Sequence, residues 1–234
     1  MSESILVTGN RGFIGSHLYK RLSCVGIDLK DGQDIRTYKA NRKYDVIVHT
    51  AALTSVVKSM EDPKSYYDTN VWGTYNMVQQ HPEAHFVYLS TAGVYGEGAE
   101  HTVNSDIRPG SVYALTKHLG ELAVQHFAKS YIILRLTNVI GPGVKGEPNV
   151  YQVFREAEKL PIYGDGKQTR DFIHVDKVCD VIYRACARVF NVGSGVRKTV
   201  LEVAEEFNKP IEFHPERKGE IRHFGVADAI HIDS

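Results

Sequence analysis

The sequence predicts an α/β fold in which helices cover both faces of a parallel β-sheet. Its first two-thirds alternate short apolar runs with amphipathic stretches, the pattern of successive strand–helix–strand units. The first apolar run leads directly into a glycine-rich loop, and an acidic residue closes the second run. Together these observations predict a Rossmann-type, doubly wound parallel sheet.

The expected elements follow one another in regular alternation. The expected strands are short runs bounded by polar residues: Ser4–Thr8, Val25–Asp28, Asp45–Thr50, His85–Ser90 and Tyr131–Leu136. Between them, helical periodicity covers Gly12–Ser23, Pro63–Gln80 and Ser111–Ser130.

The texture of the chain changes near Gly141, where Gly- and Pro-rich loops surround short elements. We therefore expect a Rossmann domain over residues 1–140, to which a later segment, about 165–195, returns. Residues 141–234 are expected to form a small, loop-rich substrate-binding region over the carboxyl edge of the sheet.

Composition excludes several classes of protein. The chain has 234 residues and zero formal net charge, so no basic surface favours nucleic acid or an anionic membrane. No segment has the pattern of a transmembrane span or a signal peptide. The three cysteines form no Cys-x-x-Cys pair, which favours the reducing cytoplasm. None of the eleven histidines shows metal-ligand spacing, so we expect no metal site.

The glycine loop has the spacing of a dinucleotide-binding turn. Gly9, Gly12 and Gly15 allow a tight turn, close approach of the backbone to a pyrophosphate, and close packing of helix on strand. Asp28 follows Gly9 by nineteen residues, where a carboxylate binds the adenine ribose hydroxyls and favours NAD over NADP. Lys30 counts against that preference, and turn glycines in a flavodoxin-like sheet are the alternative.

Tyr113 and Lys117 stand one helical turn apart in a predicted helix. Lowering the pKa of a phenol from its usual value of about 10 to about 7 requires roughly 4 kcal/mol. A fixed ammonium beside the phenolate is one way to supply it. Two unrelated surface side chains are the alternative, because this spacing is common on helices.

Taken in order, the motifs of the chain resemble those of the extended short-chain dehydrogenase/reductase family, particularly UDP-glucose 4-epimerase-like nucleotide-sugar epimerases and dehydratases. The matching segments run from residue 4 to about 228 and include TGNRGFIGSHL, HTAA, LSTAGVYG, YALTK, LRLTNVIGPG, GDGKQTRDFIHVD and PERKGEI.

The resemblance implies the roles of individual residues. The implied catalytic residues are Thr91, Tyr113 and Lys117. The implied NAD-binding residues are Gly9, Gly12, Phe13, Ile14, Gly15, Asp28, Asp34, Ile35, Ala51, Ala52, Asn70, Tyr113, Lys117 and Thr137. The implied substrate-binding residues are Thr91, Tyr113, Asn138, Asn149, Val150, Arg170 and Arg217. The guanidiniums of Arg170 and Arg217 suit a diphosphate. The alternative role for Arg170 is a salt bridge to Asp171 or Asp176.

The residues after Thr91 separate the reactions of this family. Dehydratases resemble one another in carrying Asp-Glu there, and this chain has Ala92 and Gly93, which cannot move a proton. We therefore expect a nucleotide-sugar 4-epimerase that uses tightly bound NAD for transient oxidation at C4 and returns hydride to the opposite face. An NAD(P)H-dependent keto-sugar reductase and a non-catalytic NAD-binding scaffold are the alternatives.

Two further expectations concern architecture. Relatives usually fit a helix and a strand between the positions of Asp28 and Asp34, so the sheet is expected to lack one βα unit. The family uses the helices Pro63–Gln80 and Ser111–Ser130 for a two-fold dimer contact, so a homodimer is expected, with a UDP-sugar as the substrate. Burial of these helices against the chain's own sheet is the alternative.

Overall fold

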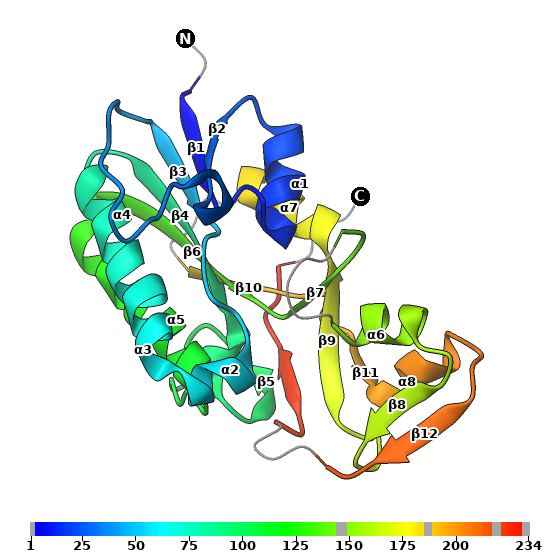
Figure 1. The fold of residues 1–234 in the computed structure, drawn as a ribbon. Helices are drawn as coiled ribbons and strands as arrows, with labels where there is room; N and C mark the ends of the chain where they lie inside the picture. The colour runs from blue at the N-terminus through cyan, green and yellow to red at the C-terminus, as the bar shows by residue number, and fades with distance from the viewer. Residues whose placement is uncertain (1–2, 144–148, 185–188, 217–220, 231–234) are drawn as a thin grey trace.

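The computed structural model describes residues 3–143, 149–184, 189–216 and 221–230. Its centre is a six-stranded parallel sheet in the order β10-β6-β4-β3-β1-β2 (Figure 1). The strands are β1 (Ile5–Thr8), β2 (Val25–Ile27), β3 (Val46–His49), β4 (His85–Thr91), β6 (Ser130–Leu136) and β10 (Val189–Val192). The Rossmann-type parallel sheet predicted from the sequence is confirmed.

Helices pack on both faces of this sheet because successive strand residues point to opposite sides. Val7 belongs to a buried cluster with Leu18 of α1, whereas the adjacent Leu6 belongs to a second cluster with Met77 of α4. The first face is covered by α1 (Phe13–Arg21) and α7 (Val175–Arg184), and the second by α4 (Thr74–Gln80) and α5 (Val112–Phe127). The carboxyl ends of the strands are left for a site.

The second strand lies at an edge of the sheet, next to β1 alone. It is followed by the short 3₁₀ helix η1 (Leu29–Asp31), and the chain then returns to β3 with no intervening strand. The expected loss of one βα unit is therefore confirmed, because the chain between β2 and β3 contains η1 and no further strand.

The expected helical stretch Pro63–Gln80 is confirmed, and it contains an irregular turn. The structure divides it into α3 (Pro63–Tyr66), a π-helical segment η2 (Tyr67–Gly73) and α4. The wider turn coincides with Asn70, whose side chain bonds to Leu53 on another segment. A π-helical turn commonly marks such a local insertion in a helix.

The C-terminal part is built from short sheets. A three-stranded sheet has the order β11-β9-β7, and parallel pairs join β12 to β8 and β13 to β5. The strands are β5 (Gly98–His101), β7 (Asn138–Ile140), β8 (Leu160–Tyr163), β9 (Thr169–His174), β11 (Arg197–Thr199), β12 (Ile211–His214) and β13 (Phe224–Val226). Helices α6 (Val150–Glu156) and α8 (Val200–Glu205) pack in a separate apolar cluster with β8.

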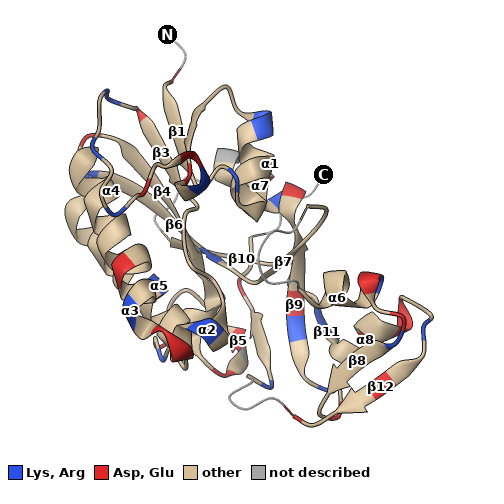
Figure 2. Ribbon diagram, viewed as in Figure 1, with Lys and Arg blue, Asp and Glu red and all other residues tan. Residues whose placement is uncertain are grey.

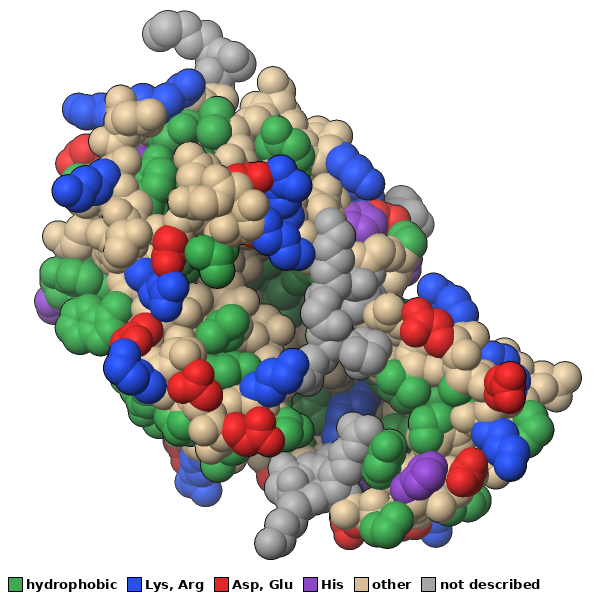
Figure 3. All heavy atoms as spheres, in the orientation of Figure 1, with side chains coloured by type: hydrophobic (Ala, Val, Ile, Leu, Met, Phe, Trp, Pro, Cys, Tyr) green, Lys and Arg blue, Asp and Glu red, His purple; other side chains and the backbone are tan. Residues whose placement is uncertain are grey.

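The surface is hollowed between this C-terminal part and the large sheet (Figure 3). Acidic and basic residues are interspersed over the whole ribbon (Figure 2), in keeping with a formal net charge of zero. Among the residues that the structure describes, no helix is both long and apolar enough to cross a membrane.

Candidate active site

The glycine loop lies between the end of β1 and the start of α1, as predicted. Gly9 has a φ of +69°, and a Cβ there would lie 2.8 Å from the backbone of Ala51. A Cβ on Gly15 would lie 2.1 Å from the Gly9 carbonyl oxygen, so only glycine allows this helix and loop to pack. Gly12 is the N-cap of α1 and provides no side-chain cap, so free N–H groups face the loop. These groups suit a phosphate.

Asp28 lies immediately after β2, where the sequence placed it. Its Oδ2 accepts a hydrogen bond from the backbone N–H of Arg11 at 3.0 Å, and its Oδ1 accepts one from Lys30 at 2.9 Å. A carboxylate offers about four acceptor positions, so two bonds leave capacity for the hydroxyls of a ribose.

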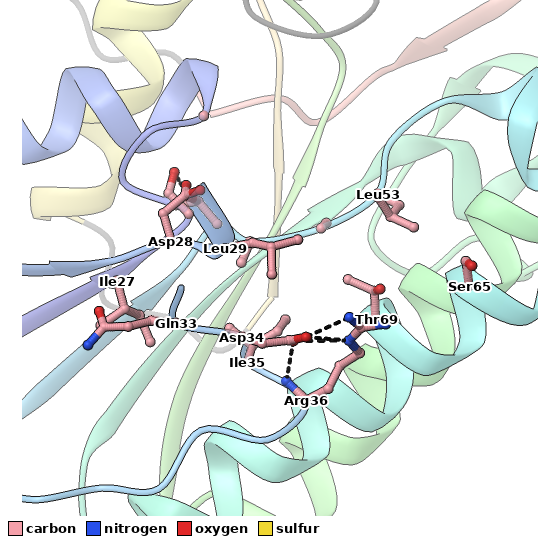
Figure 4. Close-up of a pocket in the computed structure, with 15 residues that line it drawn as sticks. Ile27, Asp28, Leu29, Gln33, Asp34, Ile35, Arg36, Leu53, Ser65 and Thr69 are labelled. Atoms are coloured by element: carbon pink, nitrogen blue, oxygen red, sulfur yellow. Dashed lines mark hydrogen bonds and ion pairs between the residues drawn. The ribbon is translucent and has the colours of Figure 1, made fainter. Parts of the chain in front are cut away.

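A cavity of about 300 Å³ adjoins this carboxylate. Figure 4 shows it between the end of β2, with Asp28 and Leu29, and the opposite wall, with Leu53 and Thr69. Its lining also includes Gly9, Gly12, Asp34, Ile35, Ala51 and Ala52, all of which the sequence assigned to the cofactor. With Asp28, the structure thus brings seven of the expected cofactor residues to one region.

Asp34 and Arg36 form an ion pair in the wall of the cavity (Figure 4). The Arg36 Nε donates to both carboxylate oxygens, at 3.0 and 2.9 Å, and this contact lowers the pKa of Asp34. Ile35 is buried and packs closely on Gly73. A Cβ at Gly73 would lie only 2.7 Å from the Ile35 side chain. The ion pair with Arg36 therefore fixes the Asp34 carboxylate, a hydrogen-bond acceptor, in the lining of the cavity, and Ile35 packs the wall beside it.

Three other expected cofactor residues act mainly through the protein core. Phe13 and Ile14 pack against the buried cluster of the sheet, which leaves their backbone groups for a ligand. Asn70 is fully buried, and its amide bonds to both backbone groups of Leu53 and to the hydroxyl of Thr116. Asn70 therefore fixes the loop after β3 against α5.

The three expected catalytic residues come from β4 and α5. Thr91 ends β4, and its hydroxyl hydrogen-bonds to the side chain of Tyr113 in the first turn of α5. Lys117 follows one turn later with its Nζ 4.1 Å from the centre of the Tyr88 ring. Ser111 caps the helix by accepting from the N–H of Ala114 at 3.2 Å. The cap and the helical spacing aim Tyr113 and Lys117 in the same direction.

Burial sets the protonation of this group. Burial raises the pKa of Tyr113 to about 12, against the opposing effect of its hydrogen bond to Thr91. Burial lowers the pKa of Lys117 to about 7, against the attraction of Glu121. At neutral pH the phenol is therefore protonated, and the lysine is poised between its two forms.

A buried polar network beneath these residues was not predicted from the sequence. Glu121 is fully buried and pairs with Arg135 of β6 through bonds of 3.0 and 2.7 Å. Ser90 donates to the same carboxylate at 2.5 Å, which explains why Ser90 faces away from Thr91. Arg135 continues the network to the hydroxyl of Tyr95 at 2.8 Å. The spacing of Glu121, one turn after Lys117, was the available sequence signal.

The turn after Thr91 carries small residues only. Ala92 and Gly93 open the 3₁₀ helix η3 (Ala92–Tyr95), and the N–H of Gly93 donates to the Thr91 hydroxyl at 3.1 Å. Ala92 is buried against Phe224 of the C-terminal part. No carboxyl group stands at either position.

The expected cofactor residue Thr137 and the expected substrate residues Asn138, Asn149 and Val150 lie in the segments that follow β6. Thr137 is buried, and its N–H donates to Val192 at 3.0 Å, while Asn138 opens β7 and donates to the carbonyl of Asp171 at 3.4 Å. Asn149 caps α6, in which Val150 is the first residue, by accepting from the N–H of Gln152 at 3.0 Å.

Arg170 lies on β9, where its Nη1 donates to the carbonyl of Thr169 at 2.8 Å. The carboxylate of Asp171 accepts from Ser194 and Gly195, and Asp176 pairs with Arg21. Arg217 lies outside the described residues. Within the part of the chain that the structure describes, no group of three or more His, Cys, Asp or Glu is arranged to hold a metal ion.

An uncapped helix after a glycine loop, a carboxylate at the end of the second strand and a cavity between them define a dinucleotide-binding α/β protein. The family model of the "NAD dependent epimerase/dehydratase family" matches residues 5–197. The chain belongs to this family, and NAD is its cofactor. The donors and acceptors described above fit that group.

Three known proteins illustrate the similarity. A UDP-glucose 4-epimerase of Mycolicibacterium smegmatis is 33% identical over 93% of this chain and 87% of its own length. The UDP-glucose 4-epimerase of Thermotoga maritima, solved with UDP-glucose, has a TM-score of 0.81 at 26% identity over 95% of this chain and 89% of its own. The dTDP-glucose 4,6-dehydratase of Streptomyces venezuelae, solved with NAD, shares the fold, with a TM-score of 0.83 at 24% identity over 98% and 92%.

Proposed function

We propose that this protein is a nucleotide-sugar 4-epimerase of the UDP-glucose/UDP-galactose type. The observation that carries the proposal is the hydrogen-bonded pair Thr91–Tyr113, which stands beside Ala92 and Gly93 and not beside a pair of carboxyl groups. Removal of water or carbon dioxide needs a further acid or base at that turn. Epimerisation requires only one group that accepts a proton and gives it back.

The roles of the three residues follow from their positions. Thr91 would orient the sugar hydroxyl, and Tyr113 would take the proton of that hydroxyl and later return it. The charged form of Lys117 would stabilise the phenolate, since burial strengthens the attraction between the two groups. Bound NAD supplies the hydride acceptor and donor. The lowering of the Tyr113 pKa by Lys117 stays a prediction.

The substrate handle that we propose is a nucleoside diphosphate, and UDP is our choice because two relatives are UDP-glucose 4-epimerases. Asn138 opens β7, Asn149 caps α6, Val150 begins α6, and Arg170 lies on β9. Arg170 supports this assignment physically because a guanidinium binds phosphate oxygens in pairs. Arg217 is proposed as its second guanidinium.

The proposal includes a Rossmann domain over residues 1–140 and a substrate-binding region over residues 141–234. It also includes a cytoplasmic location for the protein. The location rests on three cysteines without a paired motif. Among described residues, Cys24 and Cys179 are both free thiols.

The decisive experiment is incubation of the purified protein with a panel of UDP-, GDP-, dTDP- and CDP-sugars, without added cofactor, followed by separation of the products. Formation of the C4 epimer of one sugar supports the proposal. A 4-keto-6-deoxy product would identify a dehydratase and overturn it. Turnover that requires added NADPH and consumes it would identify a reductase, and bound NAD without any turnover would identify a scaffold.

A further inference from the structure

The glycine loop is tied to the short connection after β2 by an ion pair. Arg11 lies in the loop, and Asp31 ends η1. The Nε of Arg11 donates to the Oδ2 of Asp31 at 2.7 Å, and a second contact joins its Nη2 to Oδ1. The two side chains are 55% and 33% exposed, so both can be changed without disturbing the core.

This ion pair stands directly beside the carboxylate that faces the adenine ribose. The backbone N–H of Arg11 bonds to Asp28, and the carboxylates of Asp31 and Asp28 both raise the pKa of the Arg11 guanidinium, Asp31 more strongly. The connection is short because the βα unit is missing, and it returns Asp31 to the glycine loop three residues after Asp28. The Arg11 guanidinium, a permanent cation, is therefore held near the expected ribose position, and its N–H groups donate to Asp31.

We propose that Asp31 is a determinant of cofactor specificity, because it occupies the Arg11 guanidinium that would otherwise bind the 2′-phosphate of NADP. An arginine near this ribose accommodates a 2′-phosphate in NADP-binding proteins of this fold, and a planar guanidinium pairs with phosphate through two bonds. Here the same fork is already engaged by a carboxylate. Asp28 thus repels the phosphate, and Asp31 removes the cation that would offset this repulsion.

Stability does not explain the contact, since an exposed ion pair contributes little to folding. Its two bonds instead restrict the direction of the guanidinium. The inference rests on NAD as the cofactor and not on the sugar or the reaction, so it can fail or hold independently of the proposed epimerase activity.

The test is the ratio of the dissociation constants of NADP and NAD, measured by calorimetry on the full chain. In Asp31→Asn, which keeps the size of the side chain, we expect this ratio to fall about tenfold, the scale of a charge-assisted contact with phosphate. The affinity for NAD should change less than about threefold, because no contact with its hydroxyls is removed. At about 1 M salt the gain should shrink, because exposed charges are then screened beyond about 3 Å.

Two further variants separate the released cation from a change in net charge. The double variant Arg11→Ala, Asp31→Asn should return the ratio to that of the parent protein. Asp106→Asn removes a carboxylate from another exposed pair, with Arg108, and should leave the ratio unchanged. The proposal is overturned if Asp31→Asn keeps the parent ratio, or if the double variant retains the gain in NADP affinity.

Discussion

Tyr113 and Lys117 lie one turn apart, and burial shifts the pKa values of both toward their neutral forms. The pKa of Tyr113 rises to about 12 and that of Lys117 falls to about 7. In the ligand-free protein at neutral pH, the phenol is thus uncharged and the lysine is divided between its neutral and charged forms. Transfer of the phenol proton to the neutral amine of Lys117 would create a phenolate beside an ammonium, a favourable pair in a buried site, and the phenolate could then accept the proton of the sugar hydroxyl.

The first prediction concerns Tyr113→Phe, which removes one hydroxyl and keeps the ring. Turnover of the sugar substrate should fall by about 10² to 10⁴, the usual contribution of a positioned acid or base. NAD binding, followed by calorimetry, should persist because the cavity wall is unchanged. Normal turnover in this variant would rule out the assigned role, and Tyr131→Phe, at a partly buried position in β6, serves as the matched control.

The second prediction concerns pH and the buried Lys117. Its pKa is lower in the folded protein, about 7, than the usual 10.5, so the unfolded chain binds more protons between these values. The contribution of Lys117 to the free energy of unfolding should therefore rise with pH between about 7 and 10.5. The span of about 3.5 units sets an upper limit of about 5 kcal/mol.

Urea unfolding of the parent protein and of Lys117→Met at several pH values between about 7 and 10 measures this effect. The stability of the parent relative to the variant should increase with pH. A constant difference would show that Lys117 keeps an ordinary pKa in the folded protein, and one that falls as pH rises would show that its pKa is raised; either outcome contradicts the prediction.

At the scale of elements, α5 connects the reacting groups to the sheet. Tyr113, Lys117 and Glu121 follow one another at intervals of one turn, so one face of the helix carries the phenol, the amine and the carboxylate. Glu121 is held by Arg135 of β6 and by Ser90 of β4. These bonds hold α5 against β4, the strand that ends at Thr91.

The third prediction is that Glu121→Met destabilises the protein by about 3 to 5 kcal/mol, because Arg135 is left buried without its partner. The double variant Glu121→Met, Arg135→Met should be more stable than this single variant, since no charge remains unpaired. Denaturant midpoints compare the two. Equal midpoints would show that the loss comes from packing and not from the isolated charge.

At the scale of the molecule, η2, α4 and α5 together carry exposed aromatic residues. Trp72 is 62% exposed. The ring of Tyr75 makes edge-to-face contacts with Trp72 and Phe127, with distances of 6.0 and 5.1 Å between ring centroids. Tyr66, on the neighbouring α3, is buried within the chain. We propose that the remaining residues on η2, α4 and α5 form the interface of a homodimer, for which exposed aromatic residues are suited.

The fourth prediction follows from this surface. The parent protein should sediment as a dimer at micromolar concentration, and Trp72→Glu should shift it to a monomer, because a charge would be buried at the contact. Val196→Glu changes an equally exposed apolar residue on the other part of the molecule and should leave the mass unchanged. A monomeric parent protein would contradict the proposed interface.

Much of this arrangement could be predicted from the sequence. The strand–loop–helix order located Gly9, Gly12 and Asp28 correctly around one cavity, since backbone rules fix these positions locally. The loss of the βα unit was equally predictable from the length of the connection. The π-helical segment in the helix from Pro63 was not predicted, because the bonds that Asn70 makes across the chain leave no mark on helical periodicity.

The sequence by itself determined which residues can meet within one element: Tyr113 with Lys117 on a helix, and the glycines in their loop. The reason is that these spacings depend only on the geometry of the backbone. The tertiary structure decided how deeply these groups are buried, that Glu121 pairs with Arg135, and that Arg11 is engaged by Asp31. Burial and partners depend on segments distant in sequence, and these set the pKa of each group and the ligand it can bind.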